Sequence, residues 1–443
     1  MLTSKYYDLA GEIVLKLNSR GKSSVKSHLN QHFNEYEQYI QKNVKSEEDI
    51  ERLYTDAKNL NDIYKHALRY SGLKAFFLFL IAIDIESGNV ASFDLDASVA
   101  IALNKTNTDE IEVYLTYPGV DRDSKVNDEY TCLFKNLIYY VKGTKEYKKL
   151  KIKNVYLNLN KNKIRIGFTP YPYSGEELFE RVGKGLVGKS RDRLDKYDEK
   201  YIKACKALLE ENNCDIIFGP EIHGSEVLDA ELKNIMIGSC CGGILGPSYH
   251  HRLNNGIVIN QSTAYIRQHG HILSEKLDKF HKAIFGNGNV EGLTYEGDET
   301  EHQVILLHIR NIGRILLLIC KDFLTNTFKE LIKSLNVDIV LLQCYTPSLT
   351  EFESLGINEI YKRLVLVGNS CSGGKNLRDD DGDRIHPFFY CEYDYDHSRA
   401  ATVTKVKTFK CKECKYENKC CKVLEIVVEE IDDKQRMITQ VIL

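Results

Sequence analysis

The sequence predicts an α/β protein whose second part contains a largely buried sheet, preceded by a helix-rich N-terminal part. From residue 164 onward, short apolar runs alternate with amphipathic helical patterns. The clearest run lies in Arg314–Phe323, which is bounded by charge and too short to cross a membrane, as in a strand buried on both faces. Before residue 90, apolar residues instead recur at three- and four-residue spacing, for example at Leu53, Ala57, Leu60 and Tyr64, which indicates helices.

The expected elements follow in order along the chain. The N-terminal part has a buried segment at 73–85 and strand-like segments at 111–117 and 133–141. In the second part, we predict strands at 164–168, 214–219, 234–239, 255–260, 304–309, 313–319, 337–343 and 364–369, with helices at 191–212 and 323–334. A stretch rich in Lys and Asn, 145–163, is the predicted boundary between an N-terminal domain at 1–155 and a second domain at 160–443.

Composition narrows the class of function. The 443 residues carry a formal charge of −3, and no Lys/Arg tract is dense enough for a nucleic-acid or lipid-surface footprint. Thirteen cysteines lie in apolar segments of a chain whose start, Met1–Tyr6, has no apolar signal-peptide core, which predicts a reducing, cytoplasmic compartment. The longest apolar run, Ala75–Ile85, is about half the length that a bilayer requires, so we expect no membrane span.

Cys320 is the first candidate for chemistry. It ends a predicted buried strand, and the following residues show the spacing of an amphipathic helix. A thiol at such a junction is presented at the edge of the sheet, and the adjacent helix N-terminus favours the thiolate. The alternative is a cysteine that serves as a small buried hydrophobe.

Two further charged residues also follow predicted strands. Glu221 comes directly after Gly219 and Pro220, where the proline prevents further strand pairing. The segment 255–272 looks like a strand pair, and it leads into a lysine-containing stretch, Lys276–His281. Each of these side chains alone would be an ordinary surface charge. A glutamate, a lysine and a cysteine, each after a strand and in this order, form a specific combination.

On these residues the chain resembles the nitrilase superfamily, the carbon-nitrogen hydrolases, over about residues 163–443. The motifs that carry the resemblance are 216–221, Asn255-Gly256 with Gly270, 279–281, Gly297-Asp298, 319–322 and 367–369. The resemblance implies an α-β-β-α sandwich of two facing sheets that forms a homodimer or a higher homo-oligomer. It also implies that Glu221 is the general base, Cys320 the nucleophile, Lys279 the cation that stabilises the tetrahedral intermediate, and Glu291 a second acid that positions the lysine.

These residue types suit the hydrolysis of an amide. The carbonyl carbon of an amide is a poor electrophile, and a cysteine that forms a covalent intermediate divides one difficult step into two. A carboxylate moves the protons, and a lysine ammonium meets the developing negative charge. Because amidases dominate the resembling family, the resemblance implies a hydrolase of a small-molecule amide or carbamoyl compound, less readily of a nitrile, that requires no cofactor.

Several alternatives remain open at this point. A small shift of strand register would exchange Lys279 for Lys276. A Cys-His pair is conceivable with His223, His281 or His308, although no motif supports it. Many members of the family have tyrosine where this chain has Lys321, and the usual arginine and Phe-Pro-Glu are missing, so the substrate stays unassigned. A second class of function is a catalytically silent binding or scaffold module, since nitrilase-like domains occur joined to other modules, including in bacterial defence systems. In that case the N-terminal domain would bind a protein partner.

Gly183–Ser190 fits the phosphate-loop pattern GxxxxGK[ST], with Lys189 and Ser190 as the binding residues of an NTPase. The segment before it is polar and charged, whereas a phosphate loop should leave a buried strand directly. A surface loop is the competing interpretation.

The cysteines near the C-terminus form a candidate metal site. Cys411, Cys414, Cys420 and Cys421 could bind a structural zinc ion, although the second pair is adjacent rather than spaced as CxxC. Reduced cysteines in a hairpin are the alternative. The acidic run Asp379–Asp383 lacks the glutamate that ends an EF-hand loop, so a solvated turn is expected there.

Overall fold

A computed structural model describes the chain in segments. These are residues 35–63, 74–75, 77–85, 111–115, 137–141, 150–157, 159, 162–171, 178–182, 185–189, 191–253, 256–268, 270–284, 289–293, 302–335, 337–346, 352, 363–371, 384–396, 401–411, 420–431 and 434–442. The chain divides into two compact units, of which the first contains α3, β1 and β2, and the second contains β3 and the later strands.

The first unit combines helices with a small sheet. Helix α3 spans Glu47–Ile63, and the antiparallel strands β1 and β2 span Ile111–Leu115 and Leu137–Val141. The predicted buried segment is confirmed, since residues 77–83 are helical and bury every side chain. Phe77 stacks on Tyr36 with ring centroids 6.3 Å apart. Among the described residues, no helix is long and apolar enough to span a membrane.

The second unit contains an eight-stranded sheet in the order β11-β10-β8-β7-β4-β19-β20, with β9 paired to β10. Its strands are β4 (Lys163–Phe168), β7 (Ile216–Phe218), β8 (Gly243–Leu245), β9 (Tyr249–Arg252), β10 (Val258–Gln268), β11 (His271–Asp278), β19 (Lys422–Ile431) and β20 (Lys434–Val441). The central strands β4, β7 and β8 are parallel, so their carboxyl ends meet at one edge. The predicted strand pair is the antiparallel hairpin of β10 and β11.

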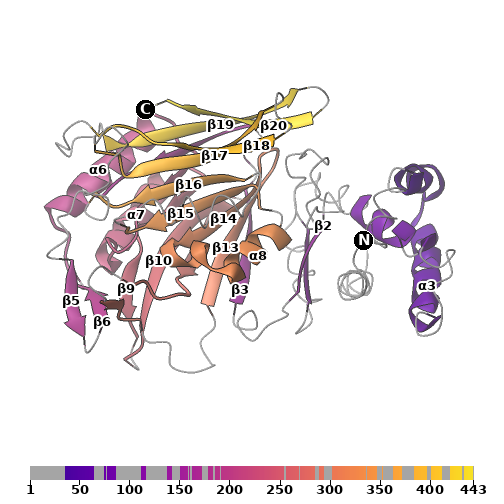
Figure 1. Cartoon of the computed structure of the whole chain (residues 1–443), viewed down its shortest axis with the longest axis horizontal. Coiled ribbons are helices and arrows are strands. Elements are labelled where there is room, and N and C mark those ends of the chain that lie inside the picture. The colour runs from indigo at the N-terminus through magenta and orange to yellow at the C-terminus, as the bar shows by residue number, and fades with distance from the viewer. Residues whose placement is uncertain are drawn as a thin grey trace. The chain divides into compact units, whose positions relative to one another are not determined.

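A seven-stranded sheet follows the order β18-β17-β16-β15-β14-β13-β3. Its strands are β3 (Leu150–Leu157), β13 (His302–Ile309), β14 (Gly313–Ile319), β15 (Ile339–Cys344), β16 (Leu364–Asn369), β17 (Phe388–Asp396) and β18 (Ala401–Lys407). Strands β14, β15 and β16 are parallel and fully buried, which confirms the reading of the apolar run before Cys320. Figure 1 shows these strands side by side.

The two large sheets pack face to face. Phe168 of β4 and Phe218 of β7 contact Phe388 of β17, with ring centroids 5.7 and 6.4 Å apart. Gly368 of β16 faces the same rings, and a Cβ atom there would lie 2.6 Å from Phe218. The absence of a side chain at this position therefore lets the sheets approach closely.

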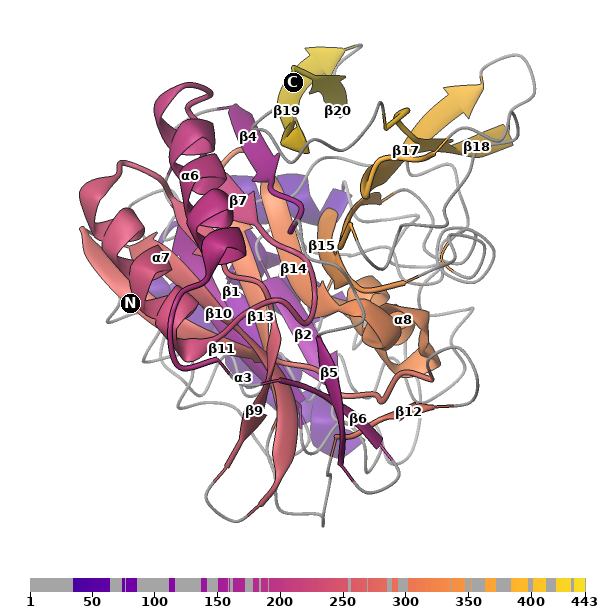
Figure 2. The ribbon, with the colours of Figure 1, turned by 90° about the vertical axis from the view of Figure 1, so that its left-hand side faces the viewer.

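Helices α6 and α7 cover the other face of the eight-stranded sheet and lie side by side in Figure 2. Helix α6 spans Lys196–Glu210 and begins later than predicted because Asp195 caps it through the backbone N–H groups of Tyr197 and Asp198. Helix α7 spans Glu226–Gly238, with Ser225 accepting a hydrogen bond from the N–H of Leu228.

The strand predicted at 234–239 is therefore wrong, because these residues form the end of α7 and the turn after it. Leu228, Leu232, Ile235 and Met236 are all buried, and their spacing of three and four residues places them on one face of the helix. Considered alone, the last six residues show too little of this period to reveal it.

The phosphate-loop interpretation is also wrong for the described part of the motif. Gly185–Gly188 form β6, which pairs with β5 (Phe179–Val182) and β12 (Val290–Glu291) in a three-stranded sheet. The N–H of Gly188 donates to Nδ1 of His250 (2.5 Å) and that of Lys189 to a carbonyl oxygen (2.8 Å), so neither is available to an anion. The first two residues and the last residue of the motif lie outside the described residues.

The proposed zinc ligands are separated by a gap in the described chain, since Cys414 lies outside it, as does the acidic run Asp379–Asp383. Cys421 is buried, with its sulfur 3.8 Å from the Thr169 hydroxyl. Within the described segments, no group of three or more potential ligands is placed to hold a metal ion. The zinc site stays a prediction.

Candidate active site

The ends of strands from both large sheets bring the three predicted residues together. Glu221 follows β7 and Lys279 follows β11 in the eight-stranded sheet, whereas Cys320 follows β14 in the seven-stranded sheet. The backbone N–H of Glu221 donates to the carbonyl oxygen of Cys344, at the end of β15, over 3.3 Å. The candidate site therefore lies where the edges of the two sheets meet.

Lys279 is the centre of a buried ionic network. Its Nζ lies 2.6 Å from Oε1 of Glu221 and 2.6 Å from Oε2 of Glu291. None of the three side chains is more than 1% exposed. An unpaired charge at this depth would be strongly unfavourable, so the network holds each member in place through the others.

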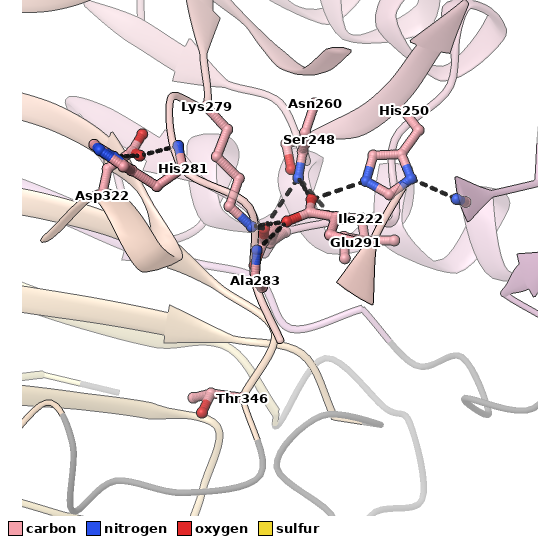
Figure 3. A network of polar contacts seen from close by, with 12 residues as sticks. Ile222, Ser248, His250, Asn260, Lys279, His281, Ala283, Glu291, Asp322 and Thr346 are labelled. Carbon is pink, nitrogen blue, oxygen red and sulfur yellow. Dashed lines mark hydrogen bonds and ion pairs between the residues drawn. The ribbon is translucent and has the colours of Figure 1, made fainter. Parts of the chain in front are cut away.

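Two further side chains orient the carboxyl groups. The amide of Asn260, on β10, donates to Glu221 at 3.0 Å and to Glu291 at 2.9 Å. Nε2 of His250, on β9, lies 2.9 Å from Oε1 of Glu291. Because Nδ1 of His250 accepts the N–H of Gly188, its Nε2 carries a proton and donates to Glu291. Figure 3 shows Lys279, Asn260 and His250 converging on the Glu291 carboxylate.

Cys320 occupies a strained backbone position at the sheet edge. Its φ of 41° lies in the left-handed region, which is uncommon for a residue with a side chain. The chain turns there from β14 into a short 3₁₀ helix, Cys320–Leu324, which precedes α8 (Asn326–Ser334). Such outliers cluster at functional sites, because the surrounding structure must hold them in place.

Four groups act on the thiol of Cys320. The Cys344 thiol donates a hydrogen bond to it, which has the largest effect on its pKa, ahead of the opposing effect of burial. The ammonium of Lys279, the N–H of Tyr345 and the carboxyl of Glu221 act in the same direction as the bond from Cys344. The pKa of Cys320 is thereby lowered to about 6, so the thiolate is the main form at neutral pH.

The carboxyl groups differ sharply in their proton affinity. Burial, followed by the charges of Cys320 and Glu291, raises the pKa of Glu221 well above its usual value. Burial alone would also raise the pKa of Glu291, but Lys279 and His250 lower it to about 2. Burial opposes the charge on Lys279, yet the neighbouring anions raise its pKa well above the usual value. The site can therefore hold a thiolate, a carboxylate, an ammonium and a protonated Glu221 together.

Asp322 connects the segment that follows Lys279 to the turn at Cys320. Its carboxylate accepts the backbone N–H groups of Phe280 and His281 at 2.9 and 2.7 Å, and it lies 2.9 Å from Nδ1 of His281 (Figure 3). Because Asp322 is two residues from Cys320 and Phe280 follows Lys279, these bonds set the position of the lysine relative to the sulfur.

Gln343 makes a second connection between the sheets. Its side-chain amide, on β15, donates to the carbonyl oxygens of Gly219 at 2.9 Å and of Gly246 at 2.7 Å. Gly219 directly follows β7, and Gly246 directly follows β8. Gly219 precedes Glu221 by two residues. The position of the glutamate is therefore fixed by the same strand that carries Cys344.

The other sequence candidates lie apart from this network. Nζ of Lys276 bonds to the Thr263 hydroxyl at 2.7 Å, and the side chain is 44% exposed. The ring of His308 stacks on Tyr156, and that of His223 stacks on Tyr171. The groups named above that lower the pKa of Cys320 do not include a histidine.

Four contributors were missed by sequence reasoning: Asn260, His250, Gln343 and Cys344. Asn260 interrupts the apolar run 257–259, and Cys344 closes the apolar strand 339–342 much as Cys320 closes β14. A polar residue or a thiol at the end of an apolar strand was the available signal. His250 offered none, because β9 is not apolar.

No protein-family model and no curated protein matches the chain, but solved structures do. A variant of the amidase from Nesterenkonia sp. AN1, with acrylamide added at the active-site cysteine, is 13% identical with a TM-score of 0.33, and the match covers 47% of this chain and 81% of the amidase. Another variant of this amidase, described as from the nitrilase superfamily, also has 13% identity and a TM-score of 0.33, with coverage of 47% and 79%.

A further match is the glutamine-dependent NAD+ synthetase from Acinetobacter baumannii. It is 15% identical with a TM-score of 0.37, and the match covers 62% of this chain and 47% of the synthetase. The chain thus has a distant structural match, over about half its length, to a nitrilase-superfamily amidase and to an NAD+ synthetase.

Proposed function

We propose that this protein hydrolyses a non-peptide carbon-nitrogen bond, in an amide or a carbamoyl compound, through a covalent intermediate on Cys320. The observation that most directly supports the proposal is the buried Lys279, which bridges Glu221 and Glu291 beside a thiol of lowered pKa. A purely structural ion pair would not need a thiolate in contact with one of its carboxyl groups.

In the first half-reaction, the Cys320 thiolate attacks the carbonyl carbon and a tetrahedral intermediate forms. The ammonium of Lys279 stabilises the negative charge that develops on the carbonyl oxygen. Glu221, whose pKa is raised, donates its proton to the departing nitrogen, and the C–N bond breaks to leave a thioester.

In the second half-reaction, the ionised Glu221 accepts a proton from water as the water oxygen attacks the thioester carbon. The intermediate collapses, the carboxylic acid leaves, and Cys320 returns to the thiolate. Glu291 stays ionised throughout, because its pKa is about 2, and it keeps Lys279 charged and oriented. These steps use only side chains of this chain, so the proposed reaction requires no cofactor.

The proposal extends to the architecture. The two facing sheets, α6 and α7 on one side and α8 on the other form an α-β-β-α sandwich that assembles as a homodimer or a higher homo-oligomer in the cytoplasm. The part of the chain before β3 acts as a separate domain for a protein partner, with its end a few residues earlier than the predicted 155 because residues 150–155 belong to β3.

The test is ammonia or amine release from a panel of small amides, carbamoyl compounds and nitriles. We expect release by the intact protein, loss of release in Cys320→Ala, and a decrease of roughly 10² to 10⁴ in Glu221→Gln. Cys240→Ser, which removes an exposed thiol outside the site, is the control and should retain full activity. No release from any compound by folded protein, with no iodoacetamide labelling of Cys320, would overturn the proposal and favour a binding module.

A further inference from the structure

Cys344 ends strand β15, and Cys320 directly follows the neighbouring strand β14. These strands are parallel, with Ile319 opposite Gln343, so the chain reaches a cysteine at the same edge one residue after each member of this pair. Neighbouring strands lie about 4.8 Å apart. Disulfide-bonded cysteines have Cα atoms separated by roughly 4.4 to 6.8 Å, so the register suits a bond between them.

The two thiols also influence each other's pKa. The Cys344 thiol donates a hydrogen bond to the Cys320 sulfur, and both residues are free cysteines. Cys344 is fully buried and Cys320 is 6% exposed. Oxidation at Cys320 would therefore place a reactive sulfur directly beside a second thiol.

Cys320 also differs from the other buried cysteines in its chemistry. Burial raises the pKa of Cys205, Cys214 and Cys241, which keeps these thiols protonated and unreactive. The Cys320 thiolate, in contrast, is stabilised by its neighbours. Oxidants react with the thiolate form, so an oxidant that enters the protein would react at Cys320 in preference to these three buried thiols.

We propose that Cys320 is a site of oxidation by hydroperoxides and that Cys344 resolves it as an intramolecular disulfide. In the first step, the Cys320 thiolate attacks one peroxide oxygen, the O–O bond breaks, and the alkoxide or hydroxide takes up a proton. Cys320 is then a sulfenic acid. In the second step, the Cys344 sulfur attacks the Cys320 sulfur, the S–O bond breaks, and the hydroxide leaves as water with the Cys344 proton.

Each cycle therefore consumes one peroxide, which is reduced by two electrons while the two thiols become a disulfide. Two equivalents of a small thiol reverse the reaction by thiol-disulfide exchange. The disulfide removes the nucleophile, so any reaction at Cys320 stops until reduction. It also prevents further oxidation of the sulfenic acid to the irreversible sulfinic acid.

This inference goes beyond the proposed hydrolase, because it depends on the two thiols and not on a substrate. The experiment treats the full chain with hydrogen peroxide, alkylates the remaining thiols, and maps them by mass spectrometry of non-reduced peptides. We expect a cross-linked peptide pair that contains Cys320 and Cys344, with full recovery of both alkylated thiols after dithiothreitol.

Two variants sharpen the test. In Cys344→Ser, the sulfenic acid on Cys320 should be trapped by dimedone, and without dimedone it should proceed to sulfinic acid that dithiothreitol does not reverse. Cys205→Ser, which changes a buried thiol elsewhere, should still form the disulfide. If Cys344→Ser does not fold, the map of the unaltered protein decides alone. A Cys320 sulfinic acid beside a still-alkylatable Cys344, or no oxidation of Cys320, would overturn the proposal whether or not amides are hydrolysed.

Discussion

The Nζ of Lys279 lies 2.6 Å from Oε2 of Glu291, and neither side chain is accessible to solvent. A second carboxyl group, that of Glu221, lies at the same distance from the ammonium. In an interior of low dielectric constant, a cation between two carboxyl groups allows one of them to stay ionised while the other retains a proton. The same ion pairs therefore stabilise the folded protein and set the protonation states that the proposed reaction needs.

Substitution of Lys279 should be strongly destabilising. Lys279→Met leaves two buried carboxyl groups without their cation, which we expect to lower the free energy of unfolding by about 3 to 5 kcal/mol. Lys276→Met, at a half-exposed position three residues earlier, should change it by less than about 1 kcal/mol. Urea unfolding at neutral pH compares the two variants. Equal losses in both would contradict the buried network.

The acid sensitivity of the fold should depend on Glu291. The pKa of this group is about 2 in the folded protein, against an ordinary value of 4.5, so between these pH values the unfolded chain binds more protons. The contribution of Glu291 to stability is therefore fully present above the ordinary value and is lost as the pH falls toward 2.

Glu291→Gln should flatten the fall in the free energy of unfolding over this interval, as measured by urea unfolding at a series of pH values. Glu199→Gln, at an exposed position on α6, serves as the control and should keep the parent slope. A variant at position 291 with an unchanged slope would show that the carboxyl is not held ionised by its neighbours.

Cys344 should set the pH dependence of thiol reactivity. The rate of alkylation of Cys320 by iodoacetamide should rise with a midpoint near pH 6, where the thiolate forms. Cys344→Ala removes the hydrogen bond to the thiolate, so the midpoint should move to higher pH. Cys240→Ser should leave it in place. The rate is followed at the Cys320 peptide by mass spectrometry, and an identical midpoint in all three proteins would refute the role of Cys344.

The close approach of the sheets should make Gly368 intolerant of a side chain. A Cβ atom there would overlap the rings of Phe168 and Phe218, both fully buried, so Gly368→Ala should destabilise the protein by about 1 to 3 kcal/mol. Gly238, at the end of α7, has no atom within 4 Å of such a Cβ. Gly238→Ala should be neutral or slightly stabilising. Thermal unfolding distinguishes the two, and equal midpoints would contradict the packing at Gly368.

The sequence by itself determined the strands that carry the site. The apolar runs that precede Glu221 and Cys320 are local signals. A strand that is covered on both faces must be apolar, and the chain must leave it through polar residues or a turn. The order of a glutamate, a lysine and a cysteine after successive strands also indicated which residues are candidates for catalysis. Local pattern failed where the segment was short, as at the end of α7, or where a loop motif could equally form a strand, as at β6.

Only the tertiary structure decided which charges meet. Lys276 and Lys279 lie on one short segment, and the register of β10 and β11 together with the turn after Asp278 directs one toward Thr263 and the other toward the two glutamates. His250 and Asn260 join the site from β9 and β10 of the eight-stranded sheet, and Cys344 joins it from β15 of the other large sheet. Their contacts depend on strand pairing and on how the two sheets pack against each other, and no local pattern of residues encodes either.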